Sequence, residues 1–380
     1  MTLGVYVQVP FCQTKCTYCN FHTGPVATSL YNPFVDAVVR EIELRAESAG
    51  PWLRAVVDTV YVGGGTPSLL EPAALGRILN ALRHGFASEW REVTLEADPE
   101  TVTAAKAAAW RGVGFNRVSM GVQSFNDIEL TAAGRMHRRE HIFSAMNALR
   151  GAGFENISCD LIAGLAHQTA ASWENSVGEL LALRPEHISI YLMEIDEGSR
   201  LGREALAGGS RYGAGALPSD DEMASSYESA CARLAEVGYE HYEISNWAVS
   251  GKHSRHNLKY WRREPYLGLG AGAHSFDGNR RWANAHDAAA YTGAMQQGQI
   301  PVEQMEAVGA DEALNEELFL GLRLLEGIDF AALERRYNVN LATRLEELRS
   351  SGLLEIEGTR ARLAPGRLSV SNEVFVELLG

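Results

Sequence analysis

The sequence predicts an α/β protein that forms a partial (β/α)6 barrel followed by a mostly helical, winged-helix-like C-terminal domain. Three observations lead to this prediction. Six short apolar runs alternate with helical stretches over residues 5–193, a glycine-rich loop then breaks the pattern, and three helices with a small hairpin follow from Asp311. With 380 residues, the chain is long enough for one large and one small domain.

The six apolar runs are candidate strands of one parallel sheet. They cover residues 5–9, 56–62, 93–96, 117–120, 157–162 and 187–192. Segments with helical spacing separate them, at residues 33–48, 72–84, 103–111, 141–151 and 171–183. Successive strand–helix units favour a parallel sheet with outer helices, whose functional residues gather at the carboxyl ends of the strands.

The pattern changes beyond the sixth strand. A glycine-rich loop covers residues 205–219, and residues 220–300 combine one helix, at 221–237, with an irregular aromatic region. Helices are expected at 311–325, 330–337 and 341–351, and a hairpin at 353–356 and 361–363. The sequence therefore predicts three parts, which are a barrel over 1–215, a connecting region over 216–305 and a C-terminal domain over 306–380.

Charge and composition exclude several classes of protein. The formal net charge of −14 argues against nucleic-acid binding, and the segment 311–380 has a net charge of −5, so partner contact is expected of the C-terminal domain instead. No apolar run approaches the roughly 20 residues of a membrane span, and the N-terminus lacks the features of a signal peptide. Five cysteines, three of them clustered, make a disulfide framework improbable and suit a reducing cytoplasm.

The clustered cysteines Cys12, Cys16 and Cys19 follow the first predicted strand with the spacing CxxxCxxC. A structural zinc site uses four protein ligands, and a four-iron cluster normally has four cysteines. Three cysteines would leave one iron of a cubane cluster open to another ligand. The alternative is a zinc site with His22 as the fourth ligand.

The residues on both sides of this loop, Val-Pro-Phe-Cys and Tyr-Cys-Asn-Phe, resemble those of the radical S-adenosylmethionine (SAM) superfamily. The resemblance implies a [4Fe–4S] cluster whose open iron binds the amino and carboxylate groups of SAM. A glycine run after the second strand, with Gly64, Gly65 and Thr66, is similar to the stretch that holds the SAM amino group in that superfamily. An ordinary tight turn is the alternative for this run.

Within the superfamily, the chain resembles the oxygen-independent coproporphyrinogen III dehydrogenase family. The resemblance implies SAM contacts from Tyr6, Gly64, Thr66, Glu96, Gln123, Arg135 and Asp160. Tyr6 and Glu96 would serve the cluster-bound SAM, and the last three would contact a second SAM, whose binding stays open. A carboxylate suits ribose hydroxyls and an arginine suits the methionine carboxylate, but a fold-stabilising ion pair is the alternative for Arg135 and Asp160.

A later segment distinguishes two branches of this family. His256, Asn257, Tyr260 and Trp261 form the pattern HNxxYW, which resembles the haem chaperones related to the dehydrogenases. Two further differences favour the haem chaperones. The dehydrogenases have a fourth cysteine where this chain has Phe21, and this chain starts only 11 residues before the first cysteine.

This resemblance implies that the protein binds haem and passes it to acceptor proteins. His256 would ligate the haem iron, the two aromatic residues would pack against the porphyrin, and nearby cations would meet the propionates. Those cations are Lys252, Arg255, Lys259, Arg262 and Arg263. The alternative is that His256 and Asn257 cap a turn while Tyr260 and Trp261 fill a domain interface.

The resemblance leaves several matters open. It does not decide whether the haem acceptors are respiratory proteins. It also does not decide whether the protein forms a homodimer or associates peripherally with a membrane. Two enzymatic readings compete with the chaperone, which are a coproporphyrinogen III dehydrogenase and a radical SAM methyltransferase. The resemblance therefore does not decide whether the protein is an enzyme.

Overall fold

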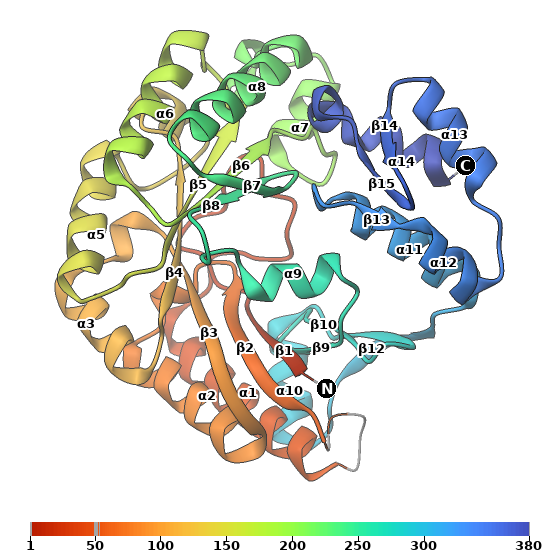
Figure 1. Ribbon diagram of the computed structural model, residues 1–380. Coiled ribbons are helices and arrows are strands. Elements are labelled where there is room, and N and C mark those ends of the chain that lie inside the picture. Colours follow the sequence, from red (N-terminus) through yellow and green to blue (C-terminus); the bar gives the residue numbers. More distant parts are fainter. Residues whose placement is uncertain (1, 49–51, 53, 380) are drawn as a thin grey trace.

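The predicted partial barrel is confirmed in the computed structural model, which describes residues 2–48, 52 and 54–379. Its six parallel strands lie side by side in chain order and curve into an arc (Figure 1). They are β1 (Thr2–Val9), β2 (Val56–Gly64), β3 (Ala87–Ala97), β4 (Arg117–Gln123), β5 (Ile157–Ala163) and β6 (His187–Leu192).

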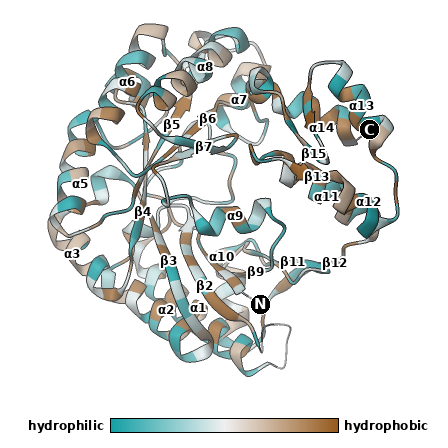
Figure 2. Ribbon diagram, viewed as in Figure 1, coloured by the Kyte–Doolittle hydropathy of each residue, from teal (hydrophilic) through white to brown (hydrophobic). Residues whose placement is uncertain are grey.

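Helices cover the outer face of this arc. They are α1 (Tyr31–Glu47), α2 (Pro72–Gly85), α3 (Ala104–Val113), α5 (Arg139–Gly151), α6 (Ala170–Leu183) and α8 (Asp220–Glu236). A short helix, α4 (Asp127–Ala132), lies between β4 and α5 in the chain. Hydrophobic and hydrophilic residues both occur along these helices (Figure 2), as expected where one side packs on a sheet and the other meets water. The short α4 follows β4 directly and was not predicted, because its single turn and a half is too short for a periodic signal.

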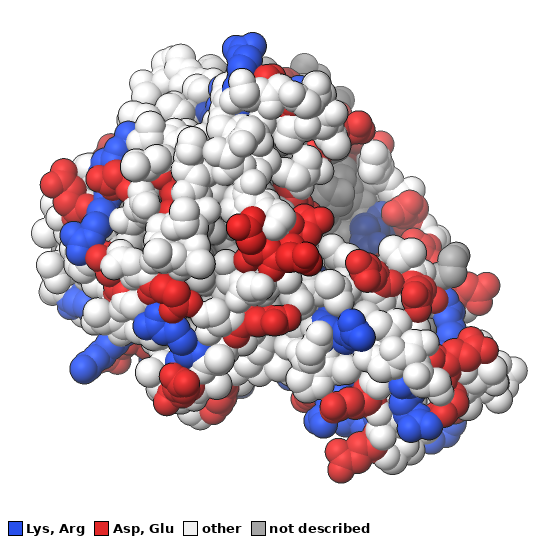
Figure 3. Space-filling model, turned by 90° about the horizontal axis from the view of Figure 1, so that it is seen from above, with Lys and Arg blue, Asp and Glu red and all other residues white. Residues whose placement is uncertain are grey.

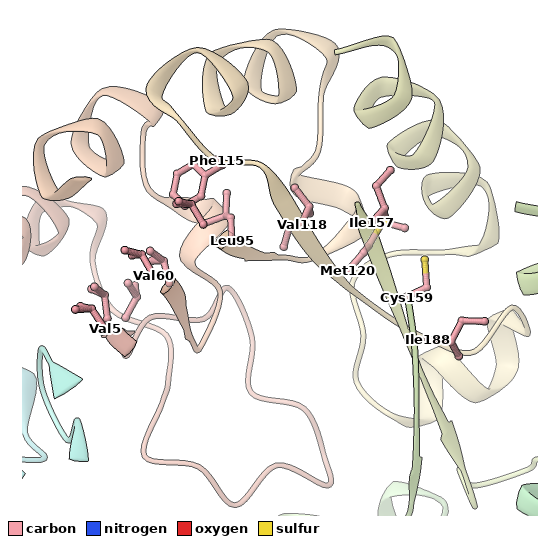
Figure 4. Close-up of a cluster of buried hydrophobic side chains, with 14 of the residues drawn as sticks. Val5, Val60, Leu95, Phe115, Val118, Met120, Ile157, Cys159 and Ile188 are labelled. Carbon is pink, nitrogen blue, oxygen red and sulfur yellow. The ribbon is translucent and has the colours of Figure 1, made fainter. Parts of the chain in front are cut away.

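The two faces of the parallel strands differ in chemistry. Apolar residues alternate with polar ones, and the apolar set points outward toward the helices, as Figure 4 shows for Val60, Leu95 and Val118. The residues between them face inward and are largely polar. They include Tyr6, Gln8, Thr59, Tyr61, Glu96, Arg117, Gln123, Asp160 and His187. The barrel interior is therefore a polar lumen rather than the packed apolar core found in closed (β/α)8 barrels.

Six further strands of the same sheet lie within or just after the region expected to be irregular. On the β6 side lie β8 (Asn246–Ala248) and β7 (Glu240–Glu243). On the β1 side lie β9 (Tyr266–Leu269), β10 (His274–Phe276), β11 (Arg280–Asn284) and β12 (Val302–Ala307). All of these strands have only three to six residues, so alternation is too brief to detect in the sequence.

Three further helices lie between β6 and the C-terminal part. They are α7 (Arg200–Leu206), which begins before the predicted glycine-rich loop, α9 (Arg255–Trp261) and α10 (Ala288–Gln296). In Figure 1, α9 lies between the curved sheet and the C-terminal helices. It contacts both β2 and α11, so the HNxxYW segment sits between the barrel and the C-terminal part.

The C-terminal part has the predicted winged-helix-like composition. Its helices are α11 (Ala310–Leu322), α12 (Phe330–Tyr337) and α13 (Ala342–Ser350), and the hairpin consists of β14 (Leu354–Glu357) and β15 (Arg360–Leu363). A two-residue strand, β13 (Ile328–Asp329), and a last helix, α14 (Ser371–Leu379), were not predicted.

The surface agrees with the charge of the sequence. Figure 3 shows acidic and basic side chains interspersed on one face, without a continuous basic area that could follow a nucleic-acid backbone. Among the described residues, no helix is both long enough and apolar enough to cross a lipid bilayer.

Candidate functional site

The three clustered cysteines lie on the loop after β1, at the carboxyl ends of the parallel strands. The backbone holds this loop at several points. The Cys12 N–H donates to the Gly24 carbonyl at 3.0 Å, and the Thr17 N–H donates to the Ala133 carbonyl at 3.0 Å. All three thiols belong to half-buried residues, whereas Cys159 is buried under the outer helices. The loop therefore presents three thiols at the mouth of the lumen.

The surroundings of the thiols bear on both candidate metal sites, the cluster and the zinc ion. Burial raises the pKa of Cys12, so the protein alone does not favour its thiolate, and a bound metal would have to do so. In the described part of the chain, no three His, Cys, Asp or Glu side chains converge as on one metal ion. A cubane cluster places its cysteine sulfurs on different irons, so no such convergence is needed. The ring of His22, the candidate zinc ligand, instead packs edge-on against His286 at 4.9 Å.

The glycine run lies directly against the cysteine loop. The Gly65 N–H donates to the Val9 carbonyl at 2.8 Å, and the Thr66 N–H to the Phe11 carbonyl at 2.6 Å. A side chain at position 65 would collide with the Phe11 carbonyl and lie 3.0 Å from the Cys12 Sγ. Gly64 has φ +113°, which L side chains rarely adopt. The close packing of this run against the cysteine loop thus depends on Gly65, and the conformation of the turn on Gly64.

Glu96 lies inside the lumen beside this run. Its carboxylate accepts from the Tyr61 hydroxyl at 2.8 Å and from the Gly64 N–H at 3.0 Å. Burial raises the Glu96 pKa to about 7, although both hydrogen bonds oppose the shift. Tyr6 stacks on Tyr61 with ring centroids 5.8 Å apart. Glu96 and Tyr6, predicted to serve the same SAM, are therefore linked through Tyr61.

The raised pKa of Glu96 predicts a pH dependence of stability. Its ordinary pKa is 4.5, so between pH 4.5 and about 7 the unfolded chain has lost this proton while the folded protein keeps it. Stability therefore falls as the pH rises through this range, by about 3 kcal/mol for this group alone. Urea unfolding of the unliganded protein at a series of pH values should show this loss in the wild type. Between pH 4.5 and about 7, the stability of Glu96→Gln relative to the wild type should rise by this amount. Parallel pH profiles of the two proteins would refute the prediction.

Arg135 forms an ion pair, although its partner is not Asp160. Its Nη2 contacts Asp98 Oδ1 and donates to the Gly121 carbonyl at 2.9 Å, and its Nη1 lies 3.6 Å from the Cys16 Sγ. Asp98 also accepts from the Thr66 hydroxyl at 3.1 Å. Asp98 thus joins the glycine run to the cysteine loop, a role that reasoning from the sequence missed although the residue lies within the motif around Glu96.

Gln123 and Asp160 line the same lumen. Gln123 ends β4 with φ +65°, a strained value for a residue with a side chain, and its Oε1 is buried without a partner among the described residues. Asp160 accepts from the Ser158 hydroxyl at 3.4 Å, and burial raises its pKa. An unpaired acceptor and a buried carboxyl group are both suited to a polar ligand in the lumen.

His256 lies at the opposite end of the lumen from the cysteines, where α9 closes it. Its Nδ1 is 3.0 Å from the Thr59 hydroxyl and its Nε2 is 2.9 Å from the Tyr260 hydroxyl. The residue is 1% exposed, and burial lowers its pKa to about 3. Both ring nitrogens are thus occupied, so a bond to iron would first require one of these hydrogen bonds to break.

The rest of the HNxxYW segment also makes contacts within the protein. Ser254, rather than His256 or Asn257, caps α9, and the Glu92 carboxylate accepts the N–H groups of Arg255 and His256. Arg323 of the C-terminal part lies over the Trp261 ring at 4.4 Å. These contacts favour the alternative in which the segment stabilises a domain interface.

Most of the cations proposed for the propionates already have partners. Lys259 pairs with Asp58 at 3.0 Å, and Arg262 and Arg263 pair with glutamates of the C-terminal part. Arg117, which the sequence analysis did not single out, is 1% exposed in the lumen, and its Nε and Nη1 find no partner among the described residues. An arginine at the start of a strand is usually exposed, so the sequence gives no sign that Arg117 is buried.

Comparisons with known proteins match both main parts of the chain. The model of the radical SAM superfamily matches residues 6–180, and that of the HemN C-terminal domain matches residues 308–366. Curated proteins named haem chaperone HemW are similar over most of their length. The one from Bacillus subtilis is 32% identical (99% of each chain), that from Mycobacterium tuberculosis 34% (99% of this chain, 95% of the relative), and that from Synechocystis 35% (93% and 85%).

Solved structures show the same fold. A coproporphyrinogen III oxidase (HemN) from Escherichia coli, described as a radical SAM enzyme, superimposes with a TM-score of 0.82. The alignment covers 100% of this chain and 89% of that one, at 23% identity. At this level of identity the likeness concerns the arrangement of the elements.

Proposed function

This chain belongs to the HemW family of haem chaperones within the radical SAM superfamily, and we propose that it binds haem and passes it to acceptor proteins while holding a SAM-ligated [4Fe–4S] cluster. The similarity to the HemW proteins over nearly the whole chain carries the chaperone part of this proposal. The three thiols beside the glycine run carry the cluster part.

The residues at the mouth fit the cluster and SAM. Cys12, Cys16 and Cys19 would hold three irons, and no described cysteine lies near enough in the chain to take the fourth. When bound and reduced, the cluster supplies one electron for cleavage of the SAM sulfonium. Backbone groups of Gly64, Gly65 and Thr66 would contact the SAM amino group, which the absence of side chains at the two glycines permits.

The lumen would orient the rest of SAM. Glu96 and Tyr6 would lie beside the cluster-bound molecule, and the Glu96 carboxylate suits its ribose hydroxyls. Gln123, Arg135 and Asp160 would contact a second SAM. For Arg135, the bonds to Asp98 and Gly121 mean that a SAM carboxylate would have to share or replace one of these partners.

We place this function in the cytoplasm and assign it to three parts of the chain, as the sequence predicts. Residues 1–215 would form the cluster and SAM part, 216–305 the connecting part and 306–380 a part that contacts partners. The match of the HemN C-terminal domain to residues 308–366 supports the last boundary. The acidic C-terminal part favours a protein partner over nucleic acid.

Anaerobic reconstitution followed by parallel haem titration and 5′-deoxyadenosine measurement tests the proposal. We expect tight haem binding, transfer of haem to an apo-haemoprotein, and negligible cleavage of SAM. Rapid cleavage with coproporphyrinogen, and formation of protoporphyrinogen, would instead establish the dehydrogenase reaction. Methyl transfer to an added substrate would establish the methyltransferase.

A further inference from the structure

A groove lies beside the cysteine loop, at the carboxyl ends of β4 and β5. It has a volume of about 610 Å³, within the range of cofactor sites. It is lined by Thr17, Asp127, Ile128, Thr131, Ala132, His167, Tyr212 and Gly213. Thr17 comes from the cysteine loop itself, the next four residues come from α4, and His167 comes from the loop after β5. The groove is thus separate from the buried base of the lumen where His256 lies.

The lining of this groove matches the chemistry of haem. His167 is exposed, and its ring makes no hydrogen bond within the described part of the chain. The Ile128 side chain is 65% exposed, and the Tyr212 ring, against which Arg200 and Arg211 lie, forms part of the wall. An imidazole binds haem iron, and aromatic and aliphatic side chains pack against a porphyrin.

Cations stand at the edge of the groove for the two propionates. The guanidinium groups of Arg200 and Arg211 each lie 5.3 Å from the centre of the Tyr212 ring. The Arg200 Nε is buried and has no partner among the described residues. The one carboxylate of the lining, Asp127, already accepts the Arg139 N–H at 2.8 Å. That bond leaves the charge of Asp127 in place, so the two guanidinium groups against this one carboxylate are what favour an anionic ligand here.

The backbone on the far side of the groove is strained. His167 has φ +69° and Tyr212 has φ +59°, values that cost energy in residues with side chains. A hydrogen bond of 2.8 Å from the His167 N–H to the Ala216 carbonyl ties the two loops together. The imidazole and the phenol ring are thus held in place at an energetic cost, as is frequent at binding sites.

We propose that haem docks in this groove with His167 as the iron ligand and Arg200 and Arg211 beside its propionates. This inference rests on the proposed haem binding and names its site. His256 then has a structural role at the closed base of the lumen, where both of its ring nitrogens have protein partners.

The groove is also joined to the cysteine loop. Besides the bond from Thr17 to Ala133, the Leu201 N–H donates to the Thr17 carbonyl at 2.8 Å. Tyr18 of the loop and Tyr212 of the groove pack on the same buried apolar cluster, formed by Ala133, Ile162, Leu165, Met193 and Leu201. Ordering of the loop by a cluster should therefore change haem affinity, and haem should change cluster stability by the same factor.

Haem titration of the reconstituted protein, followed through the Soret band, tests the site. His167→Ala and His167→Gly should each weaken haem binding by about tenfold or more and alter the Soret spectrum. Glycine suits the positive φ, so the second variant guards against loss of folding. His84→Ala is the matched control, because His84 lies exposed on the outer helix α2 and its ring bonds only to the Asn80 carbonyl.

The outcomes separate the site from the function. Haem binding by the wild type with unchanged affinity and spectrum in both His167 variants would overturn the site while leaving the proposed function intact. A wild type that binds no haem would overturn both. Equal weakening in His84→Ala would show that the effect is not specific, and would also overturn the site.

Discussion

Cys16→Ser is expected to abolish the iron–sulfur cluster. A serine hydroxyl is a poor ligand for cluster iron, and only three cysteines lie on the loop, so the loss of one leaves two irons without a protein ligand. Arg135 Nη1 lies 3.6 Å from the Cys16 Sγ, so this position also couples the loop to the Asp98 ion pair. Iron and sulfide analysis after anaerobic reconstitution should fall from about four of each per chain to near zero.

The other two cysteines provide matched controls. Cys159 is buried on the outer face of β5, and Cys231 lies on α8, away from the loop. Cys159→Ala and Cys231→Ser should both retain the full iron content. A Cys16→Ser protein with an intact cluster, or a Cys231→Ser protein without one, would contradict the assignment of ligands.

His256 is expected to make the protein sensitive to acid. Burial lowers its pKa from 6.5 to about 3, so below pH 6.5 the unfolded chain binds a proton that the folded protein does not. The stabilisation is complete above pH 6.5 and is lost as the pH falls toward 3, by about 5 kcal/mol in total. Between pH 7 and about 4.5 this loss opposes the gain that protonation of Glu96 gives, so the measurement is the difference in pH dependence between the wild type and a variant without this histidine.

His256→Gln isolates the contribution of this group. Glutamine can keep the hydrogen bond to Tyr260 but does not titrate, so the variant should lose less stability on acidification than the wild type. At pH 7 the variant should be less stable, by about 1–3 kcal/mol, because the Thr59 hydroxyl loses its partner. If both proteins respond equally to acid, His256 is not the buried neutral group described here.

The sequence was sufficient to predict the parallel strands, and it places the candidate site residues at their carboxyl ends. Runs such as 187–192 have clear strand signals and flanking helices, and the observed β6 has the same bounds. The cysteine loop and the glycine run are local in sequence, so their contact follows from the adjacency of β1 and β2. The linkage of Glu96 to the glycine run follows in the same way from the adjacent β3.

Other features depend on contacts that no local pattern encodes. β9 pairs with β1, more than 250 residues earlier, and its four residues are too few to show a period. The burial of His256 depends on partners from β2 and from its own helix, and a histidine in an exposed loop would read the same in the sequence. Asp98 and Arg117 gain their roles only once the strands are side by side.

The electron paramagnetic resonance spectrum of the reduced, reconstituted protein tests the central claim, namely that the polypeptide leaves one iron of the cluster free for SAM. We expect the cluster signal of the wild type to change on addition of SAM, since the amino and carboxylate groups then bind that iron. A cluster spectrum that saturating SAM leaves unchanged, or a protein that takes up zinc in place of iron, would contradict the account.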